Sequence, residues 1–531
     1  MSSSNRAVAR PAPDLAPAPV RDGEALATRL TDASRFPGGH ASTLVSPRTL
    51  GEVAYAVREA TALLPIGAQS SLTGGATPRG GQLLDTSQLT TLRLEGDEAV
   101  VGAGVSLLEL EAFLAEHGAY YPPIPTYTGA LVGGAVSTNA AGAATWKYGS
   151  TRPWVRGVTV VLASGDVLEL RRGEVRAADG EFVIETSAGE VRVPVPSYTM
   201  PDVPKRSAGY HAEPGMDLVD LFVGAEGTLG VLVEVRLRVV SNPPQVVTCL
   251  VPFQDAGRGL ELVAALRSAS RRTWSAEDPL GVDVRAVESM DARSVELLRA
   301  DGEDVKAGVE LAPDTALVLF VQAELPPDLD AEAALGRFAE GERSGDALVA
   351  LFALLEDYAD FDAVEVALPD DRARREQLFA LREAVPTSVN HRVRDAQRDV
   401  DPRIHKVAGD MIVPFERFQE MLGVYAREFG ERGLDYAVWG HVSDGNVHPN
   451  VIPRSYADVE RGHEALLACG REVARLGGCP LSEHGTGRNP VKQELLRQLY
   501  GEEGIAQMRA VKRALDPSGK LARDVIFPWE A

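Results

Sequence analysis

Residues 129–142 read Gly129-Ala130-Leu131-Val132-Gly133-Gly134-Ala135-Val136-Ser137-Thr138-Asn139-Ala140-Ala141-Gly142. Four glycines and four alanines in these 14 positions leave the main chain uncovered, so it can approach a planar ligand closely. Upstream, a strand predicted for residues 63–66 runs into a second loop, Gly67-Ala68-Gln69-Ser70-Ser71-Leu72-Thr73-Gly74-Gly75. Its amides and hydroxyls suit a pyrophosphate, although the glycine spacing matches neither the dinucleotide fingerprint nor the Walker pattern.

A third segment of small residues lies downstream, Val223-Gly224-Ala225-Glu226-Gly227-Thr228-Leu229-Gly230, and leads into a predicted strand at residues 231–240. Taken singly, each loop could be a flexible connection between strands. Three loops rich in accessible backbone fit a long, extended cofactor that is touched at several points better than a compact nucleotide.

Near the other end of the chain, residues 440–448 contain two histidines around a turn signal: Gly440-His441-Val442-Ser443-Asp444-Gly445-Asn446-Val447-His448. Asp444-Gly445 favours a two-residue hairpin turn between strands predicted at 436–439 and 447–452. That register places His441 opposite His448, with β-carbons about 5 Å apart. Two imidazoles and the carboxylate of Glu483 would form a three-ligand site for a divalent cation. The alternative is a polar hairpin with two hydrogen-bonded histidines.

Composition limits the classes of function. The chain of 531 residues is long enough for two or three domains. Its net charge of −22, from 76 acidic and 54 basic residues, disfavours nucleic acid as a partner. Three scattered cysteines indicate neither an iron-sulfur cluster nor a disulfide framework, and we expect a cytoplasmic protein. No apolar run reaches the roughly 18 residues of a membrane span, and the N-terminus lacks the apolar core of a secretory signal.

Local patterns divide the rest of the chain. Residues 1–20, rich in alanine, proline and serine, are predicted to be a disordered leader. Helical periodicity is present at residues 50–62, 253–269 and 330–358, and a strand is predicted at 315–323. Residues 171–205 are predicted to be a β-rich insertion, in which 181–186 pairs with 190–195. A turn-forming break at Ser241-Asn242-Pro243-Pro244 marks a domain boundary.

Together these segments resemble the flavoproteins with a vanillyl-alcohol oxidase-type FAD-binding domain, and most closely the D-2-hydroxyacid dehydrogenases (D-lactate dehydrogenase, the glycolate oxidase FAD subunit and D-2-hydroxyglutarate dehydrogenase). The resemblance rests on residues 65–75, Tyr121-Pro122-Pro123, 133–142, Lys147-Tyr148-Gly149, 222–230, Leu381-Arg382-Glu383, 440–448 and 482–485. It implies an α+β fold with a two-lobed FAD-binding domain at residues 21–243. A cap domain with an antiparallel sheet and helices would follow at 244–531, its last segment closing back over the flavin.

The resemblance implies FAD as the cofactor, bound non-covalently because nothing identifies a histidine or cysteine for covalent attachment. The residues it places at FAD are Pro65, Ile66, Gly67, Ala68, Gln69, Ser70, Ser71, Thr73, Pro122, Gly133, Gly134, Ser137, Thr138, Asn139, Gly142, Tyr148, Gly149, Glu226, Gly227, Thr228, Gly230 and Asn446. Gln69 departs from the glycine-rich composition usual at the start of the first loop.

Oxidation of a 2-hydroxy acid requires removal of the hydroxyl proton and hydride transfer to the flavin. A divalent metal, most plausibly zinc, at His441, His448 and Glu483 would chelate the substrate as a Lewis acid. His484 is the candidate base, or else it supports the ligand beside it. Arg382 and Lys406 match the cationic positions that hold the substrate carboxylate in relatives, although Arg382 also fits a solvated helical face.

Two other functions are compatible with the resemblance: a transferase of the alkyldihydroxyacetonephosphate synthase type, and a flavin-binding electron-transfer protein. The expected partners are a small 2-hydroxy acid and an electron acceptor, which would be a quinone, a cytochrome or an electron-transfer flavoprotein. Peripheral membrane contact and a homodimer are compatible with the sequence, and no transmembrane segment is expected.

Overall fold

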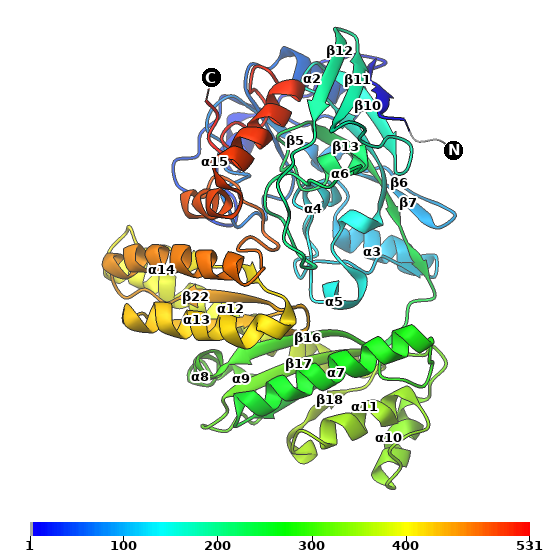
Figure 1. Ribbon diagram of the computed structural model, residues 1–531, viewed down its shortest axis with the longest axis vertical. Helices are drawn as coiled ribbons and strands as arrows, with labels where there is room; N and C mark the ends of the chain where they lie inside the picture. The colour runs from blue at the N-terminus through cyan, green and yellow to red at the C-terminus, as the bar shows by residue number, and fades with distance from the viewer. Residues whose placement is uncertain (1–3, 531) are drawn as a thin grey trace. The chain divides into compact units, whose positions relative to one another are not determined.

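The computed structural model describes residues 4–530 and divides the chain into two compact units. The first unit contains Met1–Gly142, Gly149–Ser241 and Cys479–Ala531, and the second contains Ala143–Tyr148 and Asn242–Gly478. Both units combine helices with sheets (Figure 1), so the predicted α+β class is confirmed. The break after Ser241 lies close to the predicted boundary.

The first unit is built around a six-stranded sheet with the order β2-β10-β9-β13-β7-β6 and a three-stranded parallel sheet with the order β3-β5-β4. Its elements are β1 (Arg6–Val8), β2 (Arg10–Pro11), α1 (Gly23–Ala27), β3 (Thr43–Val45), α2 (Leu50–Glu59), β4 (Leu63–Ile66), β5 (Gln82–Asp85), β6 (Leu92–Glu95), β7 (Glu98–Gly102), α3 (Leu107–Glu116), β8 (Ala119–Tyr120), α4 (Val132–Ser137), β9 (Val155–Val161), β10 (Asp166–Arg171), β11 (Glu181–Thr186), β12 (Gly189–Pro194), α6 (Leu218–Phe222), β13 (Val231–Arg238), β14 (Val240–Ser241) and α15 (Pro490–Leu515).

Helix α2 shows how local sequence and burial agree in this unit. It begins where Thr49 Oγ1 accepts the Glu52 N–H at 3.2 Å, the usual N-cap arrangement. Its apolar face, with Val53 and Val57 fully buried, packs into a core that also contains Leu84 and Leu521. Strand β4 then carries the chain to the first glycine-rich loop at the strand's carboxyl end.

The two ends of the chain are structural parts of the first unit. Strand β1 pairs in parallel with β11, and β2 pairs with β10, so the prediction of a disordered leader is wrong for these residues. The missed signal is the short alternation of Arg6–Val8, which needs β11 as a partner. At the other end, the Leu63 N–H donates to Lys520 O and the Ala522 N–H donates to Leu63 O, each at 2.8 Å. Residues 479–531 therefore belong to the first unit and not to the cap.

The inserted hairpin forms with a shifted turn. Strands β11 and β12 pair from Glu181↔Pro194 to Thr186↔Gly189, so two residues, Ser187 and Ala188, connect them. Gly189 has a φ of 125°, which glycine adopts more readily than other residues. The predicted hairpin is confirmed, with its second strand one residue earlier in the chain than expected.

The second unit contains one antiparallel sheet with the order β18-β15-β17-β16-β21-β22-β19, with β20 also paired to β22. Its elements are α5 (Thr145–Tyr148), β15 (Gln245–Phe253), α7 (Ala256–Ala276), β16 (Val284–Asp291), α8 (Ala292–Ala300), α9 (Glu303–Lys306), β17 (Leu317–Leu325), α10 (Ala331–Ala339), α11 (Ala347–Glu356), β18 (Glu365–Ala367), α12 (Arg372–Asp399), β19 (Val407–Ala408), β20 (Met411–Ile412), α13 (Phe418–Glu431), β21 (Tyr436–Gly440), β22 (Asn446–Val451) and α14 (Tyr456–Arg475).

Helix boundaries in the second unit differ from the expected ones. Phe253 ends β15, and α7 begins at Ala256 after Asp255 caps it through the Gly257 N–H. The periodicity at residues 330–358 belongs to two helices, α10 and α11, each with its own aspartate N-cap. Aspartate before an apolar run is the usual start signal of a helix.

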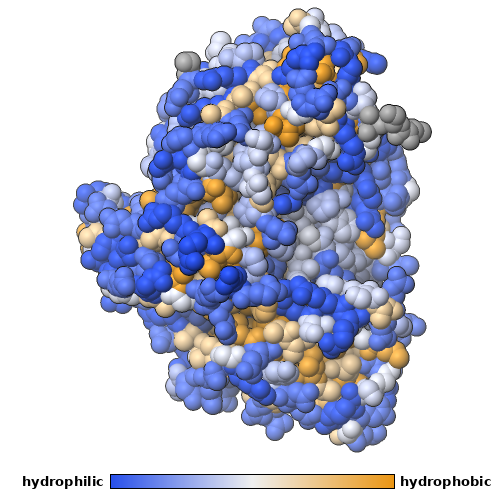
Figure 2. Space-filling view, viewed as in Figure 1, coloured by the Kyte–Doolittle hydropathy of each residue, from blue (hydrophilic) through white to orange (hydrophobic). Residues whose placement is uncertain are grey.

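The surface is mainly hydrophilic on the face drawn in Figure 2. None of the helices within residues 4–530 combines the length and the apolar character needed to cross a membrane. Helix α11 is the kind of segment that could be mistaken for one, but its apolar residues are buried inside the second unit.

Candidate active site

The three glycine-rich loops line one cavity of about 320 Å³ in the first unit. The candidate base His484 and the candidate ligand Glu483 line the same cavity. Of the residues predicted to contact FAD, the cavity is lined by Pro65, Ile66, Gly67, Ala68, Gln69, Ser70, Ser71, Gly133, Gly134, Ser137, Thr138, Glu226, Gly227 and Gly230. Loops that are distant in sequence thus meet around a single space that is bordered by two chemically active side chains.

Small residues are required where these loops pack. Gly133 lies in the first turn of α4, and a β-carbon there would come within 2.7 Å of Ala103 Cβ. Gly134 has open space where its β-carbon would be, and it lines the cavity. The first of these glycines allows α4 to approach β7, and the second leaves backbone accessible to a ligand.

Gln69 organises the first loop with its side chain. Its φ of 54° is left-handed, and its Nε2 donates to Arg29 O at 3.0 Å and to Ala76 O at 2.8 Å. The amide thus ties the start of the loop to its end. This contact holds the shape of the loop.

Glu226 connects the third loop to the segment that carries His484. Its carboxylate accepts the Thr486 N–H at 2.8 Å and the Gly487 N–H at 2.9 Å. A β-carbon at Gly485 would lie 2.8 Å from Glu226 Oε1, so glycine is needed there. Burial raises the pKa of the Glu226 carboxyl to about 7. Glu226 was predicted as a cofactor contact, and the structure gives it a further task in fixing the loop after His484.

Glu483 has a buried cationic partner that sequence reasoning missed. Lys205 is fully buried, and its Nζ donates to Glu483 Oε1. The Ser207 N–H contacts the carbonyl oxygens of Leu481 and Ser482, both at 3.1 Å. His484 is more exposed, and its Nε2 lies 3.9 Å from Glu483 Oε2. A lysine within the inserted segment could be linked to Glu483 only by knowing the fold.

The remaining predicted FAD contacts in the first unit are engaged within the protein. Thr228 is fully buried, and its Oγ1 lies 2.7 Å from Tyr210 Oη. Gly142 packs so that a β-carbon would meet Ile124 O at 2.2 Å. Thr73 and Asn139 are nearly inaccessible. Pro122 and Gly149 also lie outside the cavity lining, among the residues that the structure describes.

Two further predicted FAD contacts lie in the second unit. Tyr148 donates through its hydroxyl to the Glu324 carboxylate at 2.7 Å, and Lys147 donates to Glu324 and Asp283 at 2.5 and 2.6 Å. Asn446 Nδ2 donates to Met411 O at 3.0 Å. Their assignment to FAD therefore stays a prediction from the resemblance.

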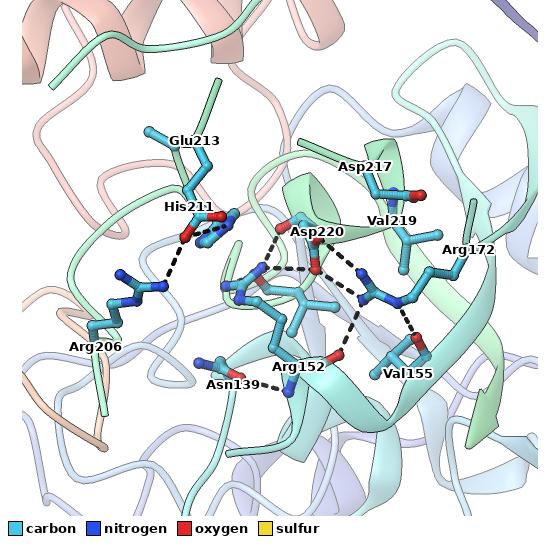
Figure 3. A network of polar contacts seen from close by, with 12 residues as sticks. Asn139, Arg152, Val155, Arg172, Arg206, His211, Glu213, Asp217, Val219 and Asp220 are labelled. Carbon is cyan, nitrogen blue, oxygen red and sulfur yellow. Dashed lines mark hydrogen bonds and ion pairs between the residues drawn. The ribbon is translucent and has the colours of Figure 1, made fainter. Parts of the chain in front are cut away.

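A network of hydrogen bonds and ion pairs connects the second loop with the segment that precedes the third (Figure 3). Asn139, with a left-handed φ of 48°, accepts the Arg152 N–H at 2.9 Å through Oδ1. The Arg152 guanidinium donates to the carbonyls of Asp220 and Val223, and Arg172 pairs with the Asp220 carboxylate at 2.8 and 2.9 Å. Burial lowers the pKa of Arg152 to about 10. The network thus links Asn139 in the second loop to the backbone at Asp220 and Val223, where the third loop begins.

His211 adjoins this network and makes stability depend on pH. Burial, with Arg152 nearby, lowers the pKa of His211 to about 3, against roughly 6.5 in an unfolded chain. Asp220 opposes this shift and Arg206 and Arg172 add to it. Between these two pH values, the His211 imidazole is protonated in the unfolded chain and neutral in the folded chain. The free energy of unfolding is therefore not reduced by His211 above a pH of about 6.5, and it falls as the pH drops toward 3.

We expect His211→Gln to flatten the acid side of the stability profile. In the parent protein, His211 should lower the free energy of unfolding by about 2 kcal/mol when the pH falls from 7 to 5. The variant should not show this decrease. Urea unfolding at a series of pH values measures it. The exposed His117 provides a control, because His117→Gln should leave the slope unchanged. An unaltered slope in His211→Gln would contradict the assignment.

In the second unit, the histidine hairpin forms with a different register. Trp439, not His441, pairs with His448, so the predicted register is wrong. Residues 442–444 form a 3₁₀ turn that ends at Gly445 with a φ of 86°. The Asn446 N–H then reaches Asp444 Oδ1 at 3.2 Å and His441 O at 3.1 Å. The aspartate side chain caps the backbone in this arrangement, which lengthens the connection beyond a two-residue turn.

The two imidazoles nevertheless lie together. Their ring centroids are 5.5 Å apart at an interplanar angle of 88°, and both residues are buried. Gly440 makes room for this, since a β-carbon there would lie 3.0 Å from His448 Cδ2. The two imidazoles thus lie together although His441 directly follows β21 and His448 lies within β22.

Each imidazole faces a buried carboxylate that sequence reasoning missed. His441 Nδ1 lies 3.6 Å from Glu288 Oε2, and His448 Nδ1 lies 3.4 Å from Asp410 Oδ1. Both carboxylates are at most 4 % exposed. Strand β16 also carries Arg285 and Asp291, so its sequence gives no signal that singles out Glu288. A carboxylate on one ring nitrogen orients the other toward a ligand.

The two cations predicted to hold a substrate carboxylate differ in their surroundings. Arg382 Nε donates to Glu288 Oε2 at 2.5 Å, and the guanidinium also contacts Glu383. No carboxylate of residues 4–530 pairs with the Lys406 ammonium. Lys406 has accessible surface, yet crowding by protein atoms lowers the pKa of its ammonium to about 8. Arg382 is thus held by Glu288 and Glu383, and Lys406 is the more available cation.

The residues present fit the two groups that the sequence predicts. For FAD, the cavity offers open backbone at Gly134 and hydroxyls at Ser70, Ser71 and Ser137, which is the donor chemistry a pyrophosphate requires. For a divalent cation, the hairpin of the second unit supplies two buried imidazoles with carboxylates behind them, and nitrogen donors of this type suit zinc.

Two family models identify the chain as a flavin-dependent oxidoreductase. Residues 41–171 match the family model described as FAD binding domain, and residues 243–526 match FAD linked oxidases, C-terminal domain. The chain belongs to the FAD-linked oxidase family.

Several curated proteins are similar over most of the chain. D-2-hydroxyglutarate dehydrogenase of Stutzerimonas stutzeri is 25% identical, covering 92% of this chain and 91% of its own. Glycolate oxidase subunit GlcD of Bacillus subtilis is 26% identical, covering 92% and 89%. The mitochondrial D-2-hydroxyglutarate dehydrogenase of Bos taurus is 28% identical, covering 96% and 81%. A solved structure of alkyldihydroxyacetonephosphate synthase matches with a TM-score of 0.61 at 15% identity, covering 96% and 83%, which supports the fold alone.

Proposed function

We propose that this enzyme oxidises a D-2-hydroxy acid of the D-lactate, glycolate or D-2-hydroxyglutarate class to the 2-oxo acid. The observation that carries the proposal is the position of His484, a titratable side chain that lines the same cavity as the three FAD loops. The names of the similar proteins support the substrate class. When bound in this cavity, FAD supplies the acceptor for the hydride from the substrate α-carbon.

His484 is proposed to remove the hydroxyl proton. Its imidazole is partly exposed, with 29% of its side-chain surface accessible, so it can meet a substrate as well as the loops. Glu226 holds the following backbone through two N–H groups, which limits the movement of His484. A base fixed within reach of the reacting hydroxyl contributes more than a mobile one.

His441, His448 and Glu483 are proposed to hold a divalent cation, most plausibly zinc. When bound, the cation supplies Lewis acidity that favours the deprotonated hydroxyl. Glu288 and Asp410 would orient the two imidazoles. Lys406 is proposed to attract the substrate carboxylate. Arg382 would add positive charge near that carboxylate while it pairs with Glu288.

The test is anaerobic reduction of the purified protein. We expect a yellow protein whose flavin absorbance is lost on adding one of D-lactate, glycolate or D-2-hydroxyglutarate. L-Lactate and L-2-hydroxyglutarate are the matched controls and should leave the colour unchanged. A flavin that none of these acids reduces, while dithionite does, would contradict the proposed substrate class and leave the family assignment intact.

Acid precipitation tests the mode of FAD binding. We expect all of the flavin in the supernatant, because FAD is proposed to be held by backbone amides and hydroxyls without a covalent bond. Absorbance spectra of supernatant and pellet measure the division. Yellow colour that stays in the pellet after washing would contradict non-covalent binding.

A further inference from the structure

A second cavity, of about 810 Å³, lies in the second unit between α7 and the segment at Phe415 and Glu416. Three arginines of α7, Arg267, Arg271 and Arg272, line it. They occupy less than two turns of one helix, and their charges therefore lie close together. This is unexpected for a chain with a net charge of −22.

Arg267 is fixed in place at the base of this cavity. Its guanidinium carbon lies 4.0 Å from the Trp146 ring centroid and 4.2 Å from that of Phe415. Its Nη1 donates to Ser443 O. The residue is only 7% exposed, and burial lowers its pKa to about 10. Two cation-π contacts and a hydrogen bond favour a single orientation of the guanidinium.

The charges of the three arginines are not balanced by ion pairs. Arg271 lies 5.1 Å from the Trp146 centroid, and Arg272 Nη1 donates to Ser268 Oγ at 2.8 Å. No carboxylate within residues 4–530 forms an ion pair with any of the three. By contrast, Arg258 at the start of the same helix pairs with Glu261 at 3.0 Å. Glu416 lines the cavity and attracts Arg267 only through a longer-range charge interaction.

We propose that this cavity binds a small soluble anion that carries two or more phosphate groups. Arginine guanidinium groups donate paired hydrogen bonds that match phosphate oxygens, and clustered cations favour a multivalent anion over a monovalent one. The site is separate from the FAD cavity and from the proposed cation ligands. It reaches the histidine hairpin through Ser443, whose carbonyl accepts from Arg267 and whose Oγ accepts the Val287 N–H at 3.0 Å.

The alternative is that Arg267 serves only packing, with its rings and the Ser443 carbonyl as sufficient partners. This alternative does not require Arg271 and Arg272 to bind anything. Substitution of these two residues therefore separates the two explanations, since both are exposed and neither is needed to hold Arg267 in place.

The experiment is titration calorimetry of the FAD-loaded protein with inorganic pyrophosphate at constant ionic strength. Because FAD occupies its cavity, the loops that would bind the FAD phosphates are not accessible to pyrophosphate. We expect saturable binding at one site per chain, weakened at least 10-fold in the double variant Arg271→Gln, Arg272→Gln. The control is Arg372→Gln, Arg398→Gln on α12, which removes the same charge from exposed positions and should bind as the parent does.

Three outcomes would overturn the proposal. The first is the absence of saturable binding to the parent protein. The second is equal weakening in both double variants, which would mean that only net charge matters. The third is sedimentation of the protein with phosphatidylglycerol vesicles without any pyrophosphate binding, which would assign the arginines to a membrane surface.

Discussion

Replacing His484 by asparagine is expected to lower the rate of flavin reduction by about 100-fold or more, the usual size of a general-base contribution. Asparagine keeps a polar side chain of similar reach but cannot take up the hydroxyl proton. The cavity should still bind FAD, since the loops that line it are unchanged. Single-turnover reduction, followed anaerobically at saturating substrate, measures the step directly.

A further measurement separates a base from a supporting residue. The metal content of His484→Asn should remain at the parent level, because the proposed ligands are other side chains. His117→Asn, at an exposed histidine of the first unit, is the matched control. Reduction of His484→Asn at the parent rate, or loss of its metal, would refute the assignment.

The cavity was predictable because its signal is local. Runs of glycine, alanine and serine at residues 65–75, 129–142 and 223–230 indicate accessible backbone wherever they occur. The strand before the first loop and the strand after the third were also visible as short apolar runs. Sequence reasoning could therefore name most of the lining of a cavity without knowing how the loops meet.

Partners that come from distant segments were not predictable. Lys205 reaches Glu483, and Glu288 reaches both Arg382 and His441, across separations that no periodicity encodes. The same holds for Glu226, whose carboxylate binds backbone N–H groups of residues 486 and 487. Such contacts depend on tertiary packing, which a single sequence does not contain as a local pattern.

The hairpin register failed for a different reason. Asp-Gly is a strong signal for a two-residue turn, but an aspartate side chain can also accept backbone N–H groups and stabilise a longer turn. Asp444 does this for Asn446. The imidazoles converge in either case, so the functional prediction for His441 and His448 did not depend on the predicted register.

Substitution of the hairpin histidines is expected to remove both the bound metal and turnover. We expect the parent protein to contain one divalent metal per chain, and His441→Ala and His448→Ala each to lose it, because two protein ligands hold a cation far more weakly than three. Turnover should fall to background in both variants. Inductively coupled plasma analysis of metal, together with flavin absorbance, measures both cofactors in one sample.

A control variant distinguishes the loss of a metal ligand from unfolding of the protein. His391, exposed on α12, can be changed to alanine with no expected effect on metal or turnover. Flavin content should remain near one per chain in every variant, since the FAD loops belong to the first unit and the hairpin to the second. Equal metal content in the parent and both hairpin variants would show that these imidazoles are buried histidines that bind no metal. Loss of flavin together with metal would instead indicate unfolding, and Glu483→Gln, which retains both hairpin histidines, would then decide whether the carboxylate is a ligand.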